Sequence, residues 1–510
     1  MSEARTIAKS SDPIRLVAAP TNEELAVVHL VAEYWPYART GGLAEAVRGI
    51  ATFQAACGTP VAVLMPLYRR VREAFPELEP LTGPFQVRVG ERLETARLFQ
   101  PPGPRRNPRV LFIEHDGYFG REGIYGEDGG DYPDNPERFA FYNLAALEVL
   151  PELLNVPVVL HAHDWHTALA PAYLRTLYAG RDPYDRMAAV LSVHNAGYQG
   201  LYDPEIIDTV GLPRELFHWR VFEYYGRVNL LKGGLVFSDA VTTVSPTHAH
   251  ELRTVAGGFG LHNTFIGLGG RFVGIRNGID LDVWNPENDS EIERTFSRLD
   301  LSGKVECKAA LQATLGLARY PGMPLIGMTA RLVGQKGLDL VLDGDVLEET
   351  EAQFVFLGAG EARYEEGLRA MAARHPDRIF VDTDFNETKE HRLLAGADML
   401  LMPSLYEPCG LTQMRAQRYG ALPIARRVGG LADTIEDQVT GFLFDEYASA
   451  DLRIALRRAT DLYRSEPDAW ALNVGEAKGR EYGWETSAQR YLDLYRRALA
   501  AHAGDDSPST

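Results

Sequence analysis

Residues 397–413 read ADMLLMPSLYEPCGLTQ, and this stretch decides the fold of the second half of the chain. Residues 397–404 have the continuous apolar character of a buried strand, and residues 410–417 have the apolar spacing of a helix. Ligands of open α/β sheets bind beyond the carboxyl ends of the strands, where helix-start amides favour anions and hydroxyls. We therefore expect Glu407 to face a ligand, and a cap on the following helix is the alternative interpretation.

Two other predicted strand ends carry polar side chains. The sequence HAHDWH at 161–166 follows the apolar run 158–160, and His194 and Asn195 follow the run 190–193. A metal site is one interpretation of the first cluster, but spacings of two and three residues do not match helical ligand pairs or the usual zinc patterns. Structural histidines are another interpretation. The recurrence after successive strands favours one polyhydroxylated ligand held by several loops.

A glycine turn lies near the N-terminus, where residues 27–33 are a predicted strand and Arg39, Thr40, Gly41 and Gly42 precede an alanine-rich helix. Such a turn allows backbone amides to approach a phosphate closely. The turn lacks both the Gly-Lys-Ser/Thr ending of a Walker A loop and the spacing of a GxGxxG fingerprint. An ordinary helix start is therefore the competing interpretation.

A basic loop in the second half follows the predicted strand 325–327 and carries Arg331 and Lys336. Two cations five residues apart on a glycine-containing loop can bind a diphosphate from two sides. The chain has a net charge of −18, so an anionic substrate requires local positive charge to overcome the repulsion of the whole molecule. Solvated surface side chains are the alternative for this pair.

The composition is that of a large globular protein. At 510 residues, with 45% hydrophobic and 24% charged residues, the chain is long enough for two domains. No apolar run approaches the roughly 20 residues that span a bilayer, and the first 25 residues lack a signal-peptide hydrophobic region, so we expect a cytoplasmic protein without membrane contact. Three distant cysteines imply no disulfide framework, and the acidic balance argues against nucleic acid.

Predicted strands alternate with helical segments along both halves, which is typical of parallel sheets with helices on both faces. The first half runs from about residue 27 to about residue 267. We expect the strand at 271–275 to begin the second half, and the sequence shows no internal repeat.

Several short motifs together identify a resemblance to the bacterial glycogen synthases and plant starch synthases, from about residue 27 to residue 495. Their order and spacing follow the family pattern, with RTGGL at 39–43, YF at 118–119, GGDYPDN at 129–135, HDWH at 163–166, VHN at 193–195, VSPT at 244–247, RNGID at 276–280, RLVGQKG at 331–337, EPCGLTQ at 407–413 and GGLADT at 429–434.

The resemblance implies an α/β protein of the GT-B type, with two Rossmann-like doubly wound domains facing a deep interdomain cleft. It implies a retaining glycosyltransferase that moves glucose from ADP-glucose to the non-reducing end of an α-1,4-glucan. The expected organisation is an N-terminal extension over 1–25, an acceptor-side domain over 26–268, a nucleotide-sugar domain over 269–484, a C-terminal helix over 485–503 and a disordered tail over 504–510. A return of that helix to the first domain is one option.

Carried over onto matching positions, the family pattern makes Arg331 and Lys336 the pyrophosphate clamp. It makes Glu407 the holder of the donor glucose hydroxyls, and the residues that follow it in the same motif complete the donor-binding segment: Cys409, Gly410, Leu411 and Thr412. Fixed cations stabilise the charge that grows on a departing diphosphate.

The family pattern also places His194 and Asn195 beside the donor glucose, and Asp164 near the transferring carbon and the acceptor. It assigns donor binding to the glycine turn: Arg39, Thr40, Gly41 and Gly42. Phe385 stands where the family usually has a tyrosine that stacks on adenine, and a phenylalanine ring can stack on adenine as well.

Three further positions depart from the family pattern. Arg39 replaces the usual lysine, Glu45 replaces the usual aspartate, and Arg415 stands where many related enzymes carry a second glutamate. Arginine keeps the charge but has a planar fork, so donor affinity or nucleotide preference is open to change. The pairs Asp343/Asp345 and Asp382/Asp384 have the spacing of the metal-binding DxD motif of other glycosyltransferases, but this match is superficial, and in this architecture we expect turn residues. The implied enzyme uses no cofactor and no metal.

Three other classes share part of this description. A phosphorylase needs a pyridoxal-binding lysine in a longer chain, a nucleotide-sugar epimerase needs no acceptor, and a non-catalytic glucan-binding protein does not need Glu407, Arg331 and Lys336. The expected partners are a nucleotide sugar and an α-glucan. The choice between ADP- and UDP-glucose, the acceptor length, the oligomeric state and the front-face or covalent course of the reaction stay open.

Overall fold

The computed structural model describes residues 25–127, 129–153, 158–320, 322–343 and 345–504. Contacts divide the chain into two compact units. The first unit takes in residues up to Val244, then Ala249–Ile275, and the chain from Trp484 onward. The second takes in Ser245–His248 and Arg276–Gly483. Both are α/β units, as predicted, and each is described separately below.

The first unit is built on a large sheet that has ten strands within the described residues, in the order β15-β14-β10-β9-β1-β2-β6-β5-β3, with β4 beside β5. The seven strands from β15 to β6 are parallel, and β5, β3 and β4 add an antiparallel edge. The strands are β1 (Ala26–Leu30), β2 (Val61–Pro66), β3 (Glu79–Pro80), β4 (Phe85–Val89), β5 (Arg92–Gln100), β6 (Arg109–Glu114), β9 (Val158–His163), β10 (Met187–Val193), β14 (Ala240–Thr243) and β15 (Phe272–Gly274).

The second unit has a fully parallel sheet, which has six strands within the described part of the chain, in the order β18-β17-β16-β19-β20-β21. Its strands are β16 (Leu325–Thr329), β17 (Gln353–Leu357), β18 (Ile379–Asp382), β19 (Met399–Met402), β20 (Leu422–Arg426) and β21 (Phe442–Phe444). Every residue of β16, β17 and β19 is buried, which explains why these strands read as continuous apolar runs.

In both sheets the order of strands reverses once. The chain first builds outward from β1 to β2 and β6, then returns to place β9 on the other side of β1; likewise β19 returns to the other side of β16. Ligands of doubly wound sheets bind at the carboxyl ends of the two strands that flank this reversal. The candidate sites are therefore the loops after β1 and β9 in the first unit and after β16 and β19 in the second.

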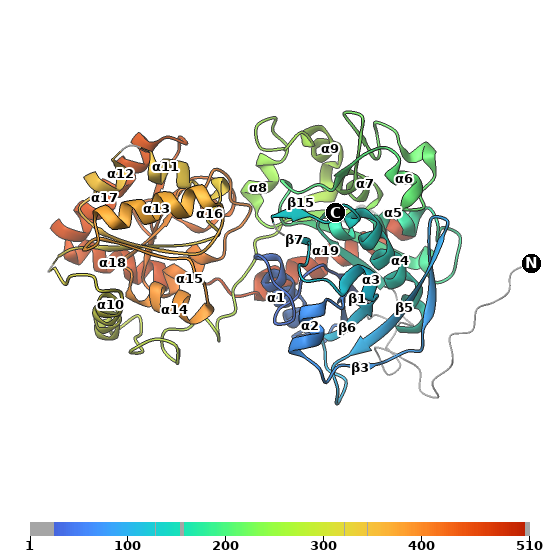
Figure 1. Ribbon diagram of the computed structural model, residues 1–510, viewed down its shortest axis with the longest axis horizontal. Coiled ribbons are helices and arrows are strands. Elements are labelled where there is room, and N and C mark those ends of the chain that lie inside the picture. Colours follow the sequence, from blue (N-terminus) through green and yellow to red (C-terminus); the bar gives the residue numbers. More distant parts are fainter. Residues whose placement is uncertain (1–24, 128, 154–157, 321, 344, 505–510) are drawn as a thin grey trace, which may run out of the picture. The chain divides into compact units, whose positions relative to one another are not determined.

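Helices cover the sheets of both units (Figure 1). Those outside the second unit are α1 (Leu43–Ala56), α2 (Arg69–Ala74), α3 (Asp116–Phe119), α4 (Asn135–Leu153), α5 (Leu169–Arg175), α6 (Ile206–Thr209), α7 (Leu230–Phe237), α9 (His262–Gly267) and α19 (Glu485–Ala503), with α8 (Pro246–Glu251) divided at the boundary. Those of the second unit are α10 (Ser302–Leu315), α11 (Leu338–Leu342), α12 (Val346–Glu349), α13 (Ala362–Arg374), α14 (Glu387–Gly396), α15 (Thr412–Arg418), α16 (Gly429–Thr434), α17 (Ser449–Ser465) and α18 (Pro467–Lys478).

Shorter elements complete the two units. Two small antiparallel pairings are formed by β7 (Gly126–Glu127) with β8 (Gly130–Asp131), and by β13 (Arg227–Asn229) with β11 (Leu201–Tyr202) and β12 (Glu223–Tyr224). Single 3-10 turns lie at η1 (Trp165–Thr167), η2 (Tyr184–Arg186), η3 (Arg214–Leu216), η4 (Gly269–Arg271) and η5 (Gly334–Lys336).

The boundary between the units differs from the one expected at residue 269. The strand expected to open the second half is β15, and it pairs in parallel with β14 of the first sheet. The first unit therefore extends to Ile275. A strand joins the sheet that can bury it, and this choice is not encoded in its local sequence.

The C-terminal helix α19 belongs to the first unit, and Figure 1 shows this red helix among elements from the start of the chain. Tyr491 and Tyr495 of α19 pack with Val27 of β1 and Ile50 of α1 in one buried cluster, next to Trp484. The tail expected to be disordered over 504–510, apart from Gly504, and the expected extension 1–25, apart from Leu25, lie outside the described residues.

Packing of α1 against the start of α19 generates a stability prediction. A β-carbon at Gly49, in the interior of α1, would lie 2.1 Å from the Trp484 indole. We expect Gly49→Ala to lower the free energy of unfolding by about 1–3 kcal/mol through overpacking. Gly475→Ala is the matched control, because that helical position has open space around it; removing a helix glycine there is expected to stabilise by up to about 1 kcal/mol. Equal thermal midpoints for the two variants would contradict this packing.

Candidate active site

The reversal point of the second sheet carries a paired cation and carboxylate. Lys336 ends the short turn η5 after β16, Glu407 lies in the loop after β19, and Lys336 Nζ is 2.7 Å from Glu407 Oε2. Ser404 Oγ donates a second hydrogen bond to the same carboxylate oxygen, at 3.2 Å. Glu407 is buried and Lys336 is mostly buried, so the ion pair is largely shielded from solvent. The two segments singled out from the sequence thus meet in one place.

Glycines allow these loops to approach so closely. Gly337 has φ 74°, and a β-carbon there would lie 1.9 Å from the carbonyl oxygen of Pro403. Gly429 has φ 43°, and a β-carbon there would lie 1.9 Å from the carbonyl oxygen of Glu407, while the amide of Gly430 donates to that oxygen at 3.1 Å. Only glycine combines this backbone conformation with this contact distance. The loop after β19 is therefore packed against Gly337 at Pro403 and against Gly429 and Gly430 at Glu407.

The structure excludes a helix cap as the role of the Glu407 side chain. The following helix, α15, begins at Thr412 rather than at Gly410 as expected, and its N-cap residue is Leu411, without a side-chain capping bond. Gly410 has φ 69°, a left-handed conformation outside the helix. The carboxylate of Glu407 is directed instead to Lys336 and Ser404.

The other predicted donor-binding residues of this unit differ in exposure. Cys409 is buried, and burial raises the pKa of its thiol to about 12, so this side chain stays a neutral thiol. Arg331 is exposed in the loop after β16, and Phe385 is 38% exposed in the loop after β18. An exposed basic side chain and an exposed ring at the carboxyl edge of one sheet suit a diphosphate and a base.

Arg415, the departure from the family pattern, has a structural environment. Its guanidinium lies 3.1 Å from Glu390 and 4.1 Å from the centre of the Trp284 ring, and all three side chains are buried. Charge reversal at this position is therefore compensated within the second unit by an ion pair and a cation–π contact.

The reversal point of the first sheet carries Asp164, directly after β9. Its carboxylate oxygen Oδ1 accepts hydrogen bonds from the amides of His194, at 2.7 Å, and Asn195, at 3.3 Å. Asp164 has φ 59°, which is unusual for a residue with a β-carbon and costs of order 1–3 kcal/mol at such sites. Burial raises the pKa of Asp164 to about 7, and the two backbone hydrogen bonds offset part of that increase.

The glycine turn lies in the segment between β1 and α1, and two of its amides have an acceptor within the protein. The buried carboxylate of Glu33 accepts from the amides of Thr40 and Gly41 and from the Thr40 hydroxyl, the last at 2.6 Å. Arg39 pairs with Glu45 at 2.5 Å, so the two departures from the family pattern contact each other. Gly42 is the N-cap residue of α1.

The histidine cluster lies deeper than expected. The strand predicted at 158–160 extends to His163, so His161 and His163 are fully buried within β9 rather than presented by a loop. His161 bonds to Tyr495 Oη and to Ser192 Oγ, both at 2.7 Å. The idea that this cluster faces a ligand is therefore wrong for these two side chains, because neighbouring strands on both sides draw them into the sheet.

The two DxD sequences serve local contacts. Asp382 accepts from the amide of Asp384 at 2.9 Å, as in an Asx turn, and both carboxylates pair with Lys389. Asp343 accepts from Ser449 Oγ at 2.6 Å.

The cysteines Cys57, Cys307 and Cys409 are free thiols. Among the described residues, no helix is long and apolar enough to cross a membrane.

Sequence reasoning missed four buried polar residues that surround the first-unit site: Glu33, His29, Gln54 and Tyr495. A polar residue inside a strand or on the apolar face of a helix is a weak signal by itself. His29 within an otherwise apolar strand, and Gln54 on the buried side of α1, were the positions at which that signal was present.

Comparison with known proteins agrees with the geometry. Residues 26–266 match the starch synthase catalytic domain, and residues 317–471 match the glycosyl transferases group 1 domain. A glycogen synthase of Syntrophotalea carbinolica is 40% identical over 92% of this chain and 98% of its own, and one of Thermodesulfovibrio yellowstonii is 39% identical over 91% and 96%.

Solved structures show the same likeness. The catalytic domain of starch synthase IV from Arabidopsis thaliana, bound to ADP and acarbose, superposes with a TM-score of 0.85 at 33% identity, covering 94% of this chain and 100% of that one. A sucrose-phosphate synthase from Thermosynechococcus elongatus, at 16% identity and a TM-score of 0.56, shares the fold.

Two doubly wound units with polar residues at both reversal points define a glycosyltransferase of the GT-B class. Within that class, the chain belongs to the family of bacterial glycogen synthases and plant starch synthases. The resemblance identified from the short motifs is thereby confirmed.

The raised pKa of Asp164 predicts a pH dependence of stability. In the unfolded chain this carboxyl ionises near its ordinary pKa of 3.8, whereas in the folded protein it keeps its proton up to about pH 7. The contribution of this group to the stability of the folded protein is complete below pH 4 and is lost as pH rises through 7. Asp164→Asn keeps an oxygen for the two amides and does not ionise. We therefore expect its thermal midpoint, relative to that of the wild type, to rise as the pH is increased from 4.5 to 8. A difference that shrinks with rising pH would contradict the raised pKa.

Proposed function

We propose that this chain transfers glucose from ADP-glucose to the non-reducing end of an α-1,4-glucan, with retention of configuration. The observation that carries the proposal is the Lys336–Glu407 pair at the reversal point of the second sheet, in a chain about 40% identical to glycogen synthases over nearly its whole length. The starch synthase structure bound to ADP and acarbose supports a nucleotide donor and a glucan-like acceptor.

Each unit supplies groups suited to one part of this reaction. In the second unit, Lys336 and the exposed Arg331 would bind the diphosphate, and Glu407 would accept hydrogen bonds from glucose hydroxyls. Phe385 would stack on the base. In the first unit, His194 and Asn195 would contact the donor glucose, and Asp164 holds the backbone of both residues.

A front-face displacement fits the residues best. The bond between the anomeric carbon and the phosphate oxygen breaks, the acceptor hydroxyl attacks from the same side, and the departing phosphate takes the hydroxyl proton. A covalent route needs an ionised carboxylate nucleophile. Asp164 suits that role poorly, because one oxygen is bonded to two amides and burial favours its neutral form.

The proposed enzyme needs no metal and no cofactor. Charge on the departing diphosphate would be stabilised by Lys336 and Arg331, which replaces the role that divalent cations have in other phosphate-transferring sites. The acidic pairs that resemble a DxD motif are occupied by Lys389 and Ser449 in this chain.

Transfer of radiolabelled glucose from ADP-, UDP- and GDP-glucose to glycogen and to maltodextrins, followed by α-1,4-specific digestion, tests the proposal. We expect the highest kcat/KM with ADP-glucose, label released by the digestion, and unchanged rates in EDTA. A preference for UDP-glucose would overturn the donor assignment. Activity that EDTA abolishes and magnesium or manganese restores would overturn the metal-free reaction.

Replacement of Glu407 tests the centre of the site. Glu407→Gln keeps the shape and an oxygen for Lys336 but loses the charge-assisted bonds, so kcat should fall by roughly 10²–10³-fold with a small change in thermal midpoint. Glu390→Gln is the matched control, because it breaks a buried ion pair with Arg415 elsewhere in the same unit. That variant should lose stability and retain turnover. The reverse pattern would remove Glu407 from the catalytic residues.

A further inference from the structure

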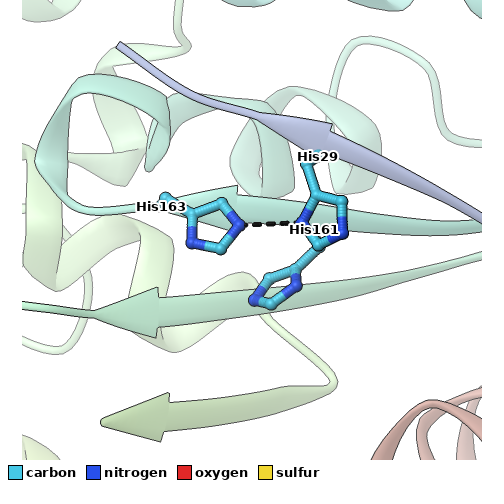
Figure 2. Close-up of side chains that lie close together, drawn as sticks. All are labelled: His29, His161 and His163. Carbon is cyan, nitrogen blue, oxygen red and sulfur yellow. Dashed lines mark hydrogen bonds between the residues drawn. The ribbon is translucent and has the colours of Figure 1, made fainter. Parts of the chain in front are cut away.

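A hydrogen-bonded chain of buried side chains runs through the first unit from Gln54 to His194. Gln54 Oε1 lies 2.9 Å from His29 Nε2, His29 Nδ1 lies 3.0 Å from His163 Nε2, and His163 Nδ1 lies 2.9 Å from His194 Nε2. Figure 2 shows the middle of this chain, with the His29 and His163 rings facing each other and His161 beside them. The chain links helix α1 to the residue after β10 through strands β1 and β9.

All three imidazoles are neutral at physiological pH. Burial lowers the pKa of His29 to about 4 and that of His194 to about 3, and it lowers the pKa of His163 well below its ordinary value. A neutral imidazole has one N–H donor and one acceptor nitrogen. The hydrogen bonds of such a chain must therefore all run in the same direction.

The amide of Gln54 decides that direction. Its oxygen only accepts, so His29 carries its proton on Nε2 and accepts on Nδ1. His163 then donates from Nε2 and accepts on Nδ1, and His194 donates from Nε2. His194 Nδ1 is left without a proton, as an acceptor.

In this orientation the other end of the Gln54 amide also has a partner. Gln54 Nε2 donates to Tyr495 Oη of helix α19 at 2.9 Å. The Tyr495 hydroxyl then donates to His161 Nδ1, and His161 Nε2 donates to Ser192 Oγ. Both ends of the amide thus have a partner, and His161 lies on the branch that leaves the amide through Tyr495.

A metal site is the competing explanation of the same histidines. Ligand atoms of His29, His161 and His163 lie within 4.8 Å of one another, as metal ligands do. However, one nitrogen of His29 faces Gln54, one nitrogen of His163 faces His194, and both nitrogens of His161 face hydroxyl groups. The three lone pairs therefore do not converge on one point.

We propose that Gln54 is a positioning residue for glucosyl transfer, which sets the tautomer of His194 through His29 and His163. The unprotonated Nδ1 of His194 then accepts a hydrogen bond from a hydroxyl of the donor sugar. The second statement rests on the proposed function. The first concerns the protein without substrate and can be tested alone.

Nitrogen NMR of the ligand-free protein, labelled with ¹⁵N-histidine, measures the tautomer directly. The His194 signals are assigned from their loss in His194→Gln. We expect His194 to carry its proton on Nε2 and not on Nδ1. A proton on Nδ1, or a stoichiometric transition metal in the purified protein, would overturn the proposal.

Two variants separate tautomer control from packing. Gln54→Met keeps the length of the side chain but removes the acceptor, so His194 should populate both tautomers and kcat/KM should fall by about 3- to 10-fold, the effect of one neutral hydrogen bond. Tyr142→Phe is the matched control: it removes buried hydrogen bonds to Val31 and Leu64 in the same unit, outside the histidine network, and the His194 tautomer and turnover should not change.

The outcomes remain distinguishable from failure of the proposed function. A Gln54→Met protein that is less stable but keeps the wild-type His194 tautomer would show a merely structural role and overturn the inference. Absence of glucan synthesis by the wild-type protein would overturn the proposed function and leave the tautomer measurement intact. If Gln54→Met does not fold, the tautomer of the wild-type protein still decides.

Discussion

The reversal of strand order in the parallel part of each sheet is the constraint on which the rest of the structure depends. Two neighbouring strands whose connections leave in opposite directions create a gap that no backbone segment fills. In the second unit this gap receives Lys336 from one side and Glu407 from the other. Glycines at 337 and 429 then bring the loops to contact distance, so the topology fixes the place and the glycines fix the distance.

Electrostatics gives the two sites different characters. The second-unit site pairs a carboxylate with an ammonium group. The first-unit site removes charge by burial: Asp164 is shifted towards its neutral form and the nearby histidines are neutral. In a chain with net charge −18, this division keeps a positive charge at the second-unit site and limits negative charge at the first-unit site.

Buried polar groups connect parts of the first unit that are distant in sequence. Tyr495 near the C-terminus contacts Gln54 of α1 and His161 of β9, so helix α19 completes a hydrogen-bond network as well as an apolar core. Such networks stabilise one arrangement when every member has a partner. This accounts for the return of the C-terminal helix to the unit in which the chain begins.

The sequence by itself determined the α/β class, the family and the two motifs that carry Lys336 and Glu407, because apolar periodicity and short motifs are local properties. The contact between Lys336 and Glu407 was decided by the tertiary structure. Tertiary structure decided which sheet takes the strand at 272–274, that Glu33 accepts from the glycine turn, and that β9 extends far enough to bury His161 and His163. It also decided the contacts of Gln54, His29 and Tyr495. These features depend on partners up to several hundred residues away, and no local pattern carries the identity of such a partner.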